Sequence, residues 1–133
     1  IEGYLSKEPI NHEILPGLWL GRRCHPKDLP ANTERVIDAT TEFERIKGGY
    51  DYYFSVPILD ASVPDMVDFE KVMRFLNRPE ERNIPTYVHC AKGYGRSALI
   101  VMAMLFSQGK VATIEEAEAL VERKRPGVRL NSK

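Results

Sequence analysis

The stretch TYVHCAKGYGRSALIVMAMLF, residues 86–106, decides the fold of this 133-residue chain. It opens at 86–89 with β-branched and aromatic residues that are typical of a strand, introduced by Pro85. Two glycines follow, and then an apolar run at 98–106. Because this run has no polar side, the helix expected over 96–108 belongs at the centre of the molecule. The stretch therefore predicts a strand, a loop and a buried helix in direct succession.

Strands and helices alternate along the rest of the chain. Strand-like segments lie at 18–21, 35–40 and 52–58, and helices are expected at 65–77 and 114–125. This alternation predicts an α/β fold with a central, mostly parallel sheet of four to five strands flanked by helices. Ligands of such sheets bind beyond the carboxyl ends of the strands. We therefore expect the functional site in the glycine loop that joins the last strand to the buried helix.

Composition and charge exclude several classes of protein. Nineteen basic and nineteen acidic residues cancel, so no nucleic-acid partner is expected. The longest apolar run is too short for a transmembrane segment. Two cysteines are too few for a disulfide framework and favour a reducing, cytoplasmic location. The length fits a single domain over residues 1–133, and because the chain starts with Ile1 rather than methionine, a longer native protein is allowed for.

The loop after the last predicted strand has the features that bind a tetrahedral anion such as phosphate. Gly93 and Gly95 let the backbone curl, and the amides of a curled loop at a helix N-terminus point into one hollow. Arg96 at the helix start adds a guanidinium that can bind two oxygens. A cation there opposes the helix dipole unless an anion is bound, which favours a functional role over a surface position. The residues expected to form this phosphate-binding loop are His89, Ala91, Lys92, Gly93, Tyr94 and Gly95.

Cys90 lies where the strand meets this loop. Amide groups and a helix N-terminus favour the thiolate, so the sequence predicts a lowered thiol pKa and a nucleophile that attacks phosphorus. Ser97 can donate a hydrogen bond to the sulfur and make it a better leaving group, and His89 can orient the loop from the strand. The alternative, a buried structural Cys90, is disfavoured by the register of the glycines, the arginine and the serine. Cys24 follows Arg22 and Arg23 and is expected to be structural, and a role as redox partner of Cys90 is the less favoured alternative.

The pattern His-Cys-x-x-Gly-x-x-Arg-Ser at 89–97 resembles the signature of the cysteine-dependent protein tyrosine phosphatases. The short chain is most similar to their compact dual-specificity branch, and segments 15–21 and 124–128 add weaker similarity. The resemblance implies a phosphatase without a metal or cofactor. It would act through a phosphocysteine intermediate on phosphotyrosine, and also on phosphoserine or phosphothreonine, in proteins. It also implies a general acid after the third strand. Asp60 matches that position, and Asp65 is the alternative.

Three other functions fit the same loop less well. A phosphoinositide or other phospholipid phosphatase would use Lys92 to bind a multiply charged head group, although relatives that act on lipids typically have their cations at other loop positions. A non-catalytic phosphate-binding module would normally lack the cysteine, the arginine or the acid, and this chain has all three. The sulfur-transfer group has no counterpart of the Asp60 loop. The phosphatase family also continues into a final helix, often with a Gln that positions water, whereas this chain stops at Lys133. Nothing in the sequence indicates an oligomeric state.

Overall fold

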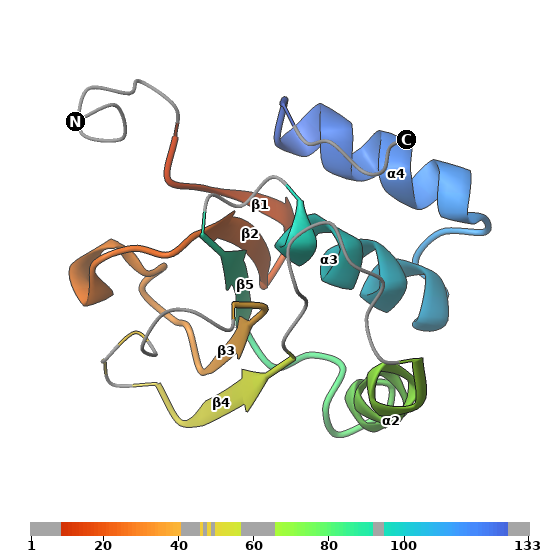
Figure 1. Cartoon of the computed structure of the whole chain (residues 1–133), viewed down its shortest axis with the longest axis horizontal. Helices are drawn as coiled ribbons and strands as arrows, with labels where there is room; N and C mark the ends of the chain where they lie inside the picture. The colour runs from red at the N-terminus through yellow and green to blue at the C-terminus, as the bar shows by residue number, and fades with distance from the viewer. Residues whose placement is uncertain are drawn as a thin grey trace.

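The computed structural model of the chain describes residues 9–40, 46, 48, 50–56, 66–91 and 95–127. These residues form a five-stranded sheet in the order β1-β2-β5-β3-β4 (Figure 1). The β1 strand pairs antiparallel with β2, whereas the other neighbouring pairs are parallel. The mostly parallel α/β sheet that the sequence predicts is therefore confirmed. The strands are Asn11–Leu15 (β1), Leu18–Arg22 (β2), Arg35–Asp38 (β3), Tyr52–Ser55 (β4) and Thr86–Cys90 (β5).

Within the described part of the chain, the helices are a short 3-10 helix at Pro26–Asp28 and three α-helices, α2 (Met66–Leu76), α3 (Arg96–Ser107) and α4 (Ile114–Lys124). The α3 helix lies against β5 and contacts both α2 and α4, as Figure 1 shows. Most of its side chains are buried, which confirms the predicted central helix, although Phe106 is 46% exposed. None of these helices is long and apolar enough to cross a lipid bilayer.

Three strands differ from the sequence prediction by more than one residue. The strand expected at 52–58 ends at Ser55 (β4), and residues 57 and 58 of that range lie outside the described residues. The strand expected at 35–40 ends at Asp38, because the Asp38 carboxylate accepts hydrogen bonds from the backbone and side chain of Thr40 and turns the chain. The β1 strand was not predicted, since its sequence NHEIL has a single fully buried residue and no clear alternation. A turn with Gly17 at φ 83° connects β1 to β2, and only this pairing with β2 makes β1 recognisable as a strand.

The sheet has a larger core on one face and a smaller core on the other. Val88 and Cys90 of β5 belong to the larger core, together with the buried side chains of α3. Tyr87 belongs to the smaller core. Because successive side chains of a strand point to opposite faces, His89 shares the face of Tyr87, whereas Cys90 faces the helices. The two residues at the end of β5 therefore act on opposite sides of the sheet.

Gly21 in β2 is a position where a side chain does not fit. A Cβ atom there would lie 2.6 Å from the Asn11 Cβ and 2.8 Å from the Ile10 carbonyl oxygen, and it would also overlap the Tyr87 hydroxyl. We predict that Gly21→Ala lowers the free energy of unfolding by about 1–3 kcal/mol, measured by urea denaturation. Gly48→Ala is the matched control, because a Cβ there meets its nearest neighbour at 3.5 Å. Equal effects of the two substitutions would contradict this packing argument.

Candidate active site

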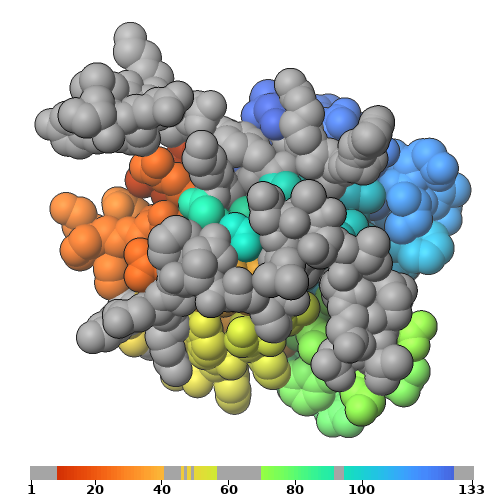
Figure 2. All heavy atoms as spheres, in the orientation of Figure 1, coloured from red at the N-terminus to blue at the C-terminus, as the bar shows by residue number. Residues whose placement is uncertain are grey.

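The connection between β5 and α3 places the predicted nucleophile and the predicted phosphate-binding arginine at the two ends of one short loop. Cys90 is the last residue of β5, and Arg96 is the first residue of α3. Figure 2 shows teal atoms of this junction at the surface, beside the orange atoms of the segment that follows β2. The junction therefore lies where α/β sheets bind ligands. Three of the predicted loop residues lie outside the described residues: Lys92, Gly93 and Tyr94.

The N-terminus of α3 is suited to bind an anion. Its N-cap residue is Gly95, which has no side chain that could bond to the first amides of the helix. The first turn of α3 contains no acidic residue. The helix dipole and these amides therefore favour negative charge beside Cys90. Gly95 itself has φ −132°, and a Cβ there would meet no atom of the described residues within 4 Å. The left-handed conformation thus does not explain the glycine at this position.

Ser97 lies directly against the sulfur of Cys90. The Ser97 Oγ is 3.1 Å from the Cys90 Sγ, and both side chains are buried, with Cys90 only 3% exposed. This distance fits a hydrogen bond to sulfur, and the contact that the sequence predicts is present. The position of Ser97 follows from the fold, because the second residue of α3 faces the end of the strand that α3 packs against.

His89 contacts the loop from behind. The side chain is fully buried, and its Nδ1 lies 3.3 Å from the carbonyl oxygen of Cys90. Since a carbonyl can only accept, Nδ1 carries the proton and donates it. Burial lowers the pKa of His89, and the nearby Asp38 carboxylate and the Cys90 carbonyl oppose this shift only in part. A neutral ring at neutral pH is therefore placed to donate to the Cys90 carbonyl, and the orienting role expected for His89 stays a prediction.

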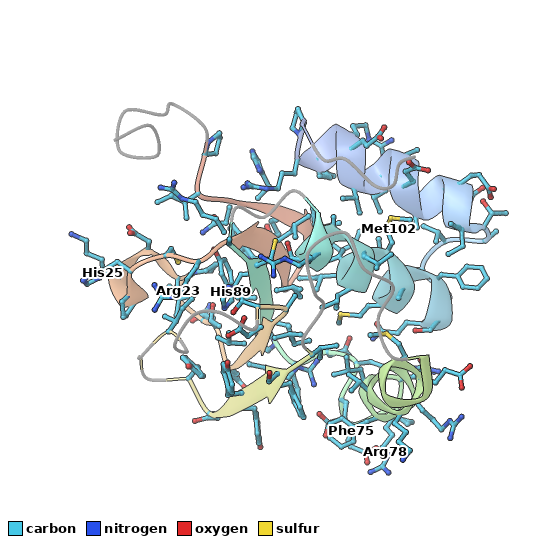
Figure 3. All side chains as sticks on the ribbon, viewed as in Figure 1. Arg23, His25, Phe75, Arg78, His89 and Met102 are labelled. Carbon is cyan, nitrogen blue, oxygen red and sulfur yellow. The ribbon has the colours of Figure 1, made fainter. Side chains whose placement is uncertain are left out.

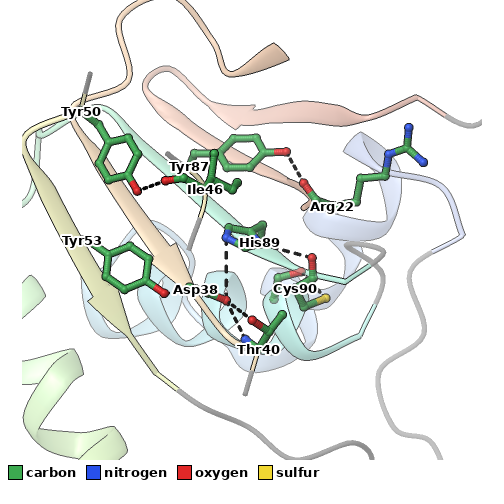
Figure 4. A network of polar contacts seen from close by, with 10 residues as sticks. Arg22, Asp38, Thr40, Ile46, Tyr50, Tyr53, Tyr87, His89 and Cys90 are labelled. Carbon is green, nitrogen blue, oxygen red and sulfur yellow. Dashed lines mark hydrogen bonds and ion pairs between the residues drawn. The ribbon is translucent and has the colours of Figure 1, made fainter. Parts of the chain in front are cut away.

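A polar cluster that the sequence did not indicate lies beside His89 (Figure 4). The Asp38 carboxylate, at the end of β3, lies 3.8 Å from the His89 Nε2 and is only 1% exposed. Thr40 donates two hydrogen bonds to it, from its amide at 2.8 Å and from its hydroxyl at 2.6 Å. The Tyr53 hydroxyl donates a third at 2.5 Å. The available signal was an acidic residue inside the strand predicted at 35–40, where charged side chains are uncommon.

The two candidates for the general acid, Asp60 and Asp65, lie outside the described residues. Along the chain they fall between β4, which ends at Ser55, and α2, which begins at Met66. Because β4 is parallel to β3 and β3 is parallel to β5, the carboxyl end of β4 lies at the same end of the sheet as Cys90. The assignment of the acid stays a prediction.

Cys24 is separated from Cys90 by the sheet. It packs on the smaller core with Tyr87, whereas Cys90 belongs to the larger core, and neither cysteine forms a disulfide. Burial raises the pKa of the Cys24 thiol, which disfavours the thiolate that a reactive cysteine needs. These observations support the structural role predicted for Cys24.

A cavity of about 170 Å³ lies at the opposite end of the parallel strands from Cys90, near the beginning of β5. Its lining includes the buried Arg35, whose guanidinium is bonded to the Thr86 hydroxyl and to both the side chain and the carbonyl of Glu81. Arg35 is thus occupied in holding β3, β5 and the segment before β5 together. The cavity is separate from the Cys90 site.

Comparison with known proteins identifies the family. Residues 27–133 match the model of the dual specificity phosphatase catalytic domain. The dual specificity protein phosphatase OPG106 of variola virus is 36% identical over 110 residues, which are 79% of this chain and 64% of the viral protein. This chain thus spans less than two thirds of that relative's length. Among solved structures, human DUSP28 has a TM-score of 0.78 at 17% identity. The match covers 92% of this chain and 86% of the DUSP28 chain. PTPMT1 in complex with PI(5)P has a TM-score of 0.76 at 22% identity, with 92% and 88% covered. The chain, with its cysteine and arginine at the two ends of the β5–α3 loop, belongs to the dual specificity phosphatase catalytic-domain family.

Proposed function

We propose that this chain is a phosphomonoester hydrolase that acts on phosphoproteins through a phosphocysteine intermediate. One observation carries the proposal: the Cys90 Sγ lies 3.1 Å from the Ser97 Oγ at the N-terminus of α3, which begins with Arg96. A nucleophile, a hydrogen-bond donor to it and an anion-binding helix end thus meet at one point. A reducing, cytoplasmic location is proposed as well, because the mechanism needs a free thiol.

In the first step, the Cys90 thiolate attacks phosphorus, and the bond from phosphorus to the leaving oxygen breaks. The loop amides and the Arg96 guanidinium hold the three remaining oxygens, whose charge is distributed in the transition state. Asp60 gives its proton to the leaving oxygen, so the product is a neutral hydroxyl group. The chain then carries the phosphoryl group on sulfur.

In the second step, water attacks phosphorus while the bond from sulfur to phosphorus breaks. The ionised Asp60 accepts the proton of the water, and inorganic phosphate leaves. The Ser97 hydroxyl donates a hydrogen bond to the departing sulfur, which stabilises the thiolate as it forms. The first-step machinery thus returns to its starting state without a metal or cofactor.

We predict that Ser97→Ala slows the second step selectively. A hydrogen bond to a charged group contributes about 1.5–3 kcal/mol, so kcat should fall about 10- to 100-fold while the first turnover stays fast. Stopped-flow hydrolysis of an aryl phosphate would show this as a burst followed by slow turnover. Ser107→Ala, at the far end of the same helix, is the control, since the Ser107 hydroxyl is bonded to the Met104 carbonyl. Loss of the burst itself would contradict the assigned role.

Phosphotyrosine, with phosphoserine and phosphothreonine, is the proposed substrate class, supported by the similarity to a viral dual specificity protein phosphatase. Phosphoinositides are the second candidate. Lys92 in the loop favours them, and one structure of similar fold is a complex with PI(5)P. The decisive experiment compares kcat/KM for phosphopeptides and for PI(5)P in vesicles, with a chelator present. Higher values for phosphopeptides are expected. Higher values for the lipid would favour the second candidate, and binding of phosphate without turnover would favour a non-catalytic module.

A further inference from the structure

We propose that Asp38 is a positioning residue for the nucleophile loop, acting through His89 on the carbonyl group of Cys90. The inference rests on the proposed function, since it concerns how the loop is prepared for phosphate. None of the residues that bind the phosphate in that proposal belongs to β3. The buried side chain of His89 connects them, because it contacts both Asp38 at the end of β3 and the Cys90 carbonyl.

The carbonyl of Cys90 is held by two donors from different elements. The backbone N–H of Arg23, just after β2, donates to it at 2.8 Å, and the His89 Nδ1–H donates at 3.3 Å. These bonds use both lone pairs of the oxygen. Because a trans peptide is planar, with N–H and C=O pointing in opposite directions, the Ala91 N–H is directed away from the His89 ring. The donors that bind the Cys90 carbonyl therefore also orient the Ala91 N–H, which is the first amide of the phosphate-binding loop.

The orientation of the His89 ring depends in turn on its surroundings. Its Nε2 is buried and has no hydrogen-bond partner within the described part of the chain. The Asp38 carboxylate faces it at 3.8 Å, and Arg23 is a second charged neighbour of the ring. The Tyr87 ring packs on the same side of the sheet, with its centroid 6.0 Å from the imidazole. Because a neutral ring with its proton on Nδ1 has only a lone pair at Nε2, the contact with Asp38 at 3.8 Å is a van der Waals contact, and the Asp38 side chain limits sterically how far the ring can turn away from the Cys90 carbonyl.

Asp38 itself is fixed. It pairs with His89 in the parallel register of β3 and β5, and the adjacent Ala39 amide donates to the His89 carbonyl at 2.9 Å. Three hydrogen bonds, two from Thr40 and one from Tyr53, satisfy the carboxylate (Figure 4). A buried carboxylate is costly, and an apolar residue of similar size is often equally stable at such a site. The presence of Asp38 beside His89, the residue before the proposed nucleophile Cys90, therefore points to a role in the site.

The test compares Asp38→Ala with Asp38→Asn in the full chain. The alanine removes the group that faces Nε2, so kcat for an aryl phosphate should fall about tenfold, and the inhibition constant of inorganic phosphate should rise. The asparagine keeps the size, its Oδ1 can still accept both bonds from Thr40, and its amide group can donate to the Tyr53 hydroxyl instead of accepting from it. The kcat value should therefore return to within about twofold of the wild-type value. Wild-type kcat in a folded Asp38→Ala variant would overturn the proposal, and so would an asparagine variant as slow as the alanine variant.

A pair of tyrosine variants keeps the test decisive if Asp38→Ala does not fold. Tyr53→Phe removes one bond that fixes the carboxylate and should lower kcat about threefold. Tyr50→Phe is the matched control, because the Tyr50 hydroxyl donates instead to the Ile46 carbonyl in the same small core. Equal kcat values for both variants would overturn the proposal. A purely structural role would lower the melting temperature and leave kcat per folded molecule unchanged.

Failure of the proposed function would have a different signature. If the wild-type chain does not hydrolyse any phosphate ester, the dissociation constant of inorganic phosphate can still be measured by calorimetry. Weaker phosphate binding by Asp38→Ala than by Asp38→Asn would then support the positioning role without the catalytic one. Equal phosphate binding by these two variants would overturn the positioning role in its own right.

Discussion

Replacing Cys90 with serine is expected to reduce phosphopeptide hydrolysis by at least about 10⁴-fold, because removing the nucleophile of a covalent mechanism removes nearly all of its rate enhancement. A serine hydroxyl has the right size, but it has no anionic form comparable to a thiolate at neutral pH. Binding of inorganic phosphate should persist, since the Arg96 guanidinium and the loop amides are unchanged. The measurement is kcat together with a phosphate dissociation constant for the same preparation.

Cys24→Ser is the matched control for this prediction. Cys24 packs on the smaller core, on the opposite face from Cys90, and burial raises the pKa of its thiol. Its replacement should leave kcat within about twofold of the wild-type value, as for most substitutions away from the site. A Cys90→Ser variant that still turns over substrate would place the chemistry in another part of the chain.

Arg96→Lys should lower kcat by about 10²–10³-fold, although the charge is kept. A guanidinium is planar and binds two oxygens at once, whereas an ammonium group is a compact charge that binds them one at a time. Because the charge on the oxygens is redistributed in the transition state, kcat and kcat/KM should fall together. Steady-state kinetics with an aryl phosphate would measure both constants.

Arg78→Lys serves as the control for that substitution. Arg78 lies just beyond α2, with its guanidinium 5.1 Å from the centre of the Phe75 ring, and Figure 3 shows this pair far from His89 and Arg23. The same chemical change there should leave kcat unaltered. If Arg96→Lys had no more effect than Arg78→Lys, the two-oxygen contact assigned to Arg96 would be wrong.

The strand, loop and helix of residues 86–106 were predictable because their signals are local. A short strand, two glycines and an apolar helix each have a sequence pattern that does not depend on distant contacts. The contact between Ser97 and Cys90 then followed from the direct succession of these elements. The family resemblance rests on the same residues, and the match to the catalytic-domain model over residues 27–133 confirms it.

The features that the sequence did not reveal depend on contacts between distant segments. The β1 strand is defined by its pairing with β2 rather than by its own residues. The role proposed for Asp38 depends on the parallel register that places it beside His89, and on Tyr53, which comes from β4. Sheet order cannot be read from the order of strands along the chain, because β5 lies between β2 and β3. The polar cluster therefore became visible only in the folded structure.

The most direct test of the account is to look for a phosphoryl group on Cys90 during turnover. The Ser97→Ala variant is mixed with a phosphotyrosine peptide, denatured within milliseconds and digested, and the peptide that contains residue 90 is weighed by mass spectrometry. We expect the mass of one added phosphoryl group on the Cys90 thiol, and none in a Ser97→Ala chain that also has Cys90→Ser. Substrate turnover with an unmodified Cys90 peptide throughout would contradict the mechanism.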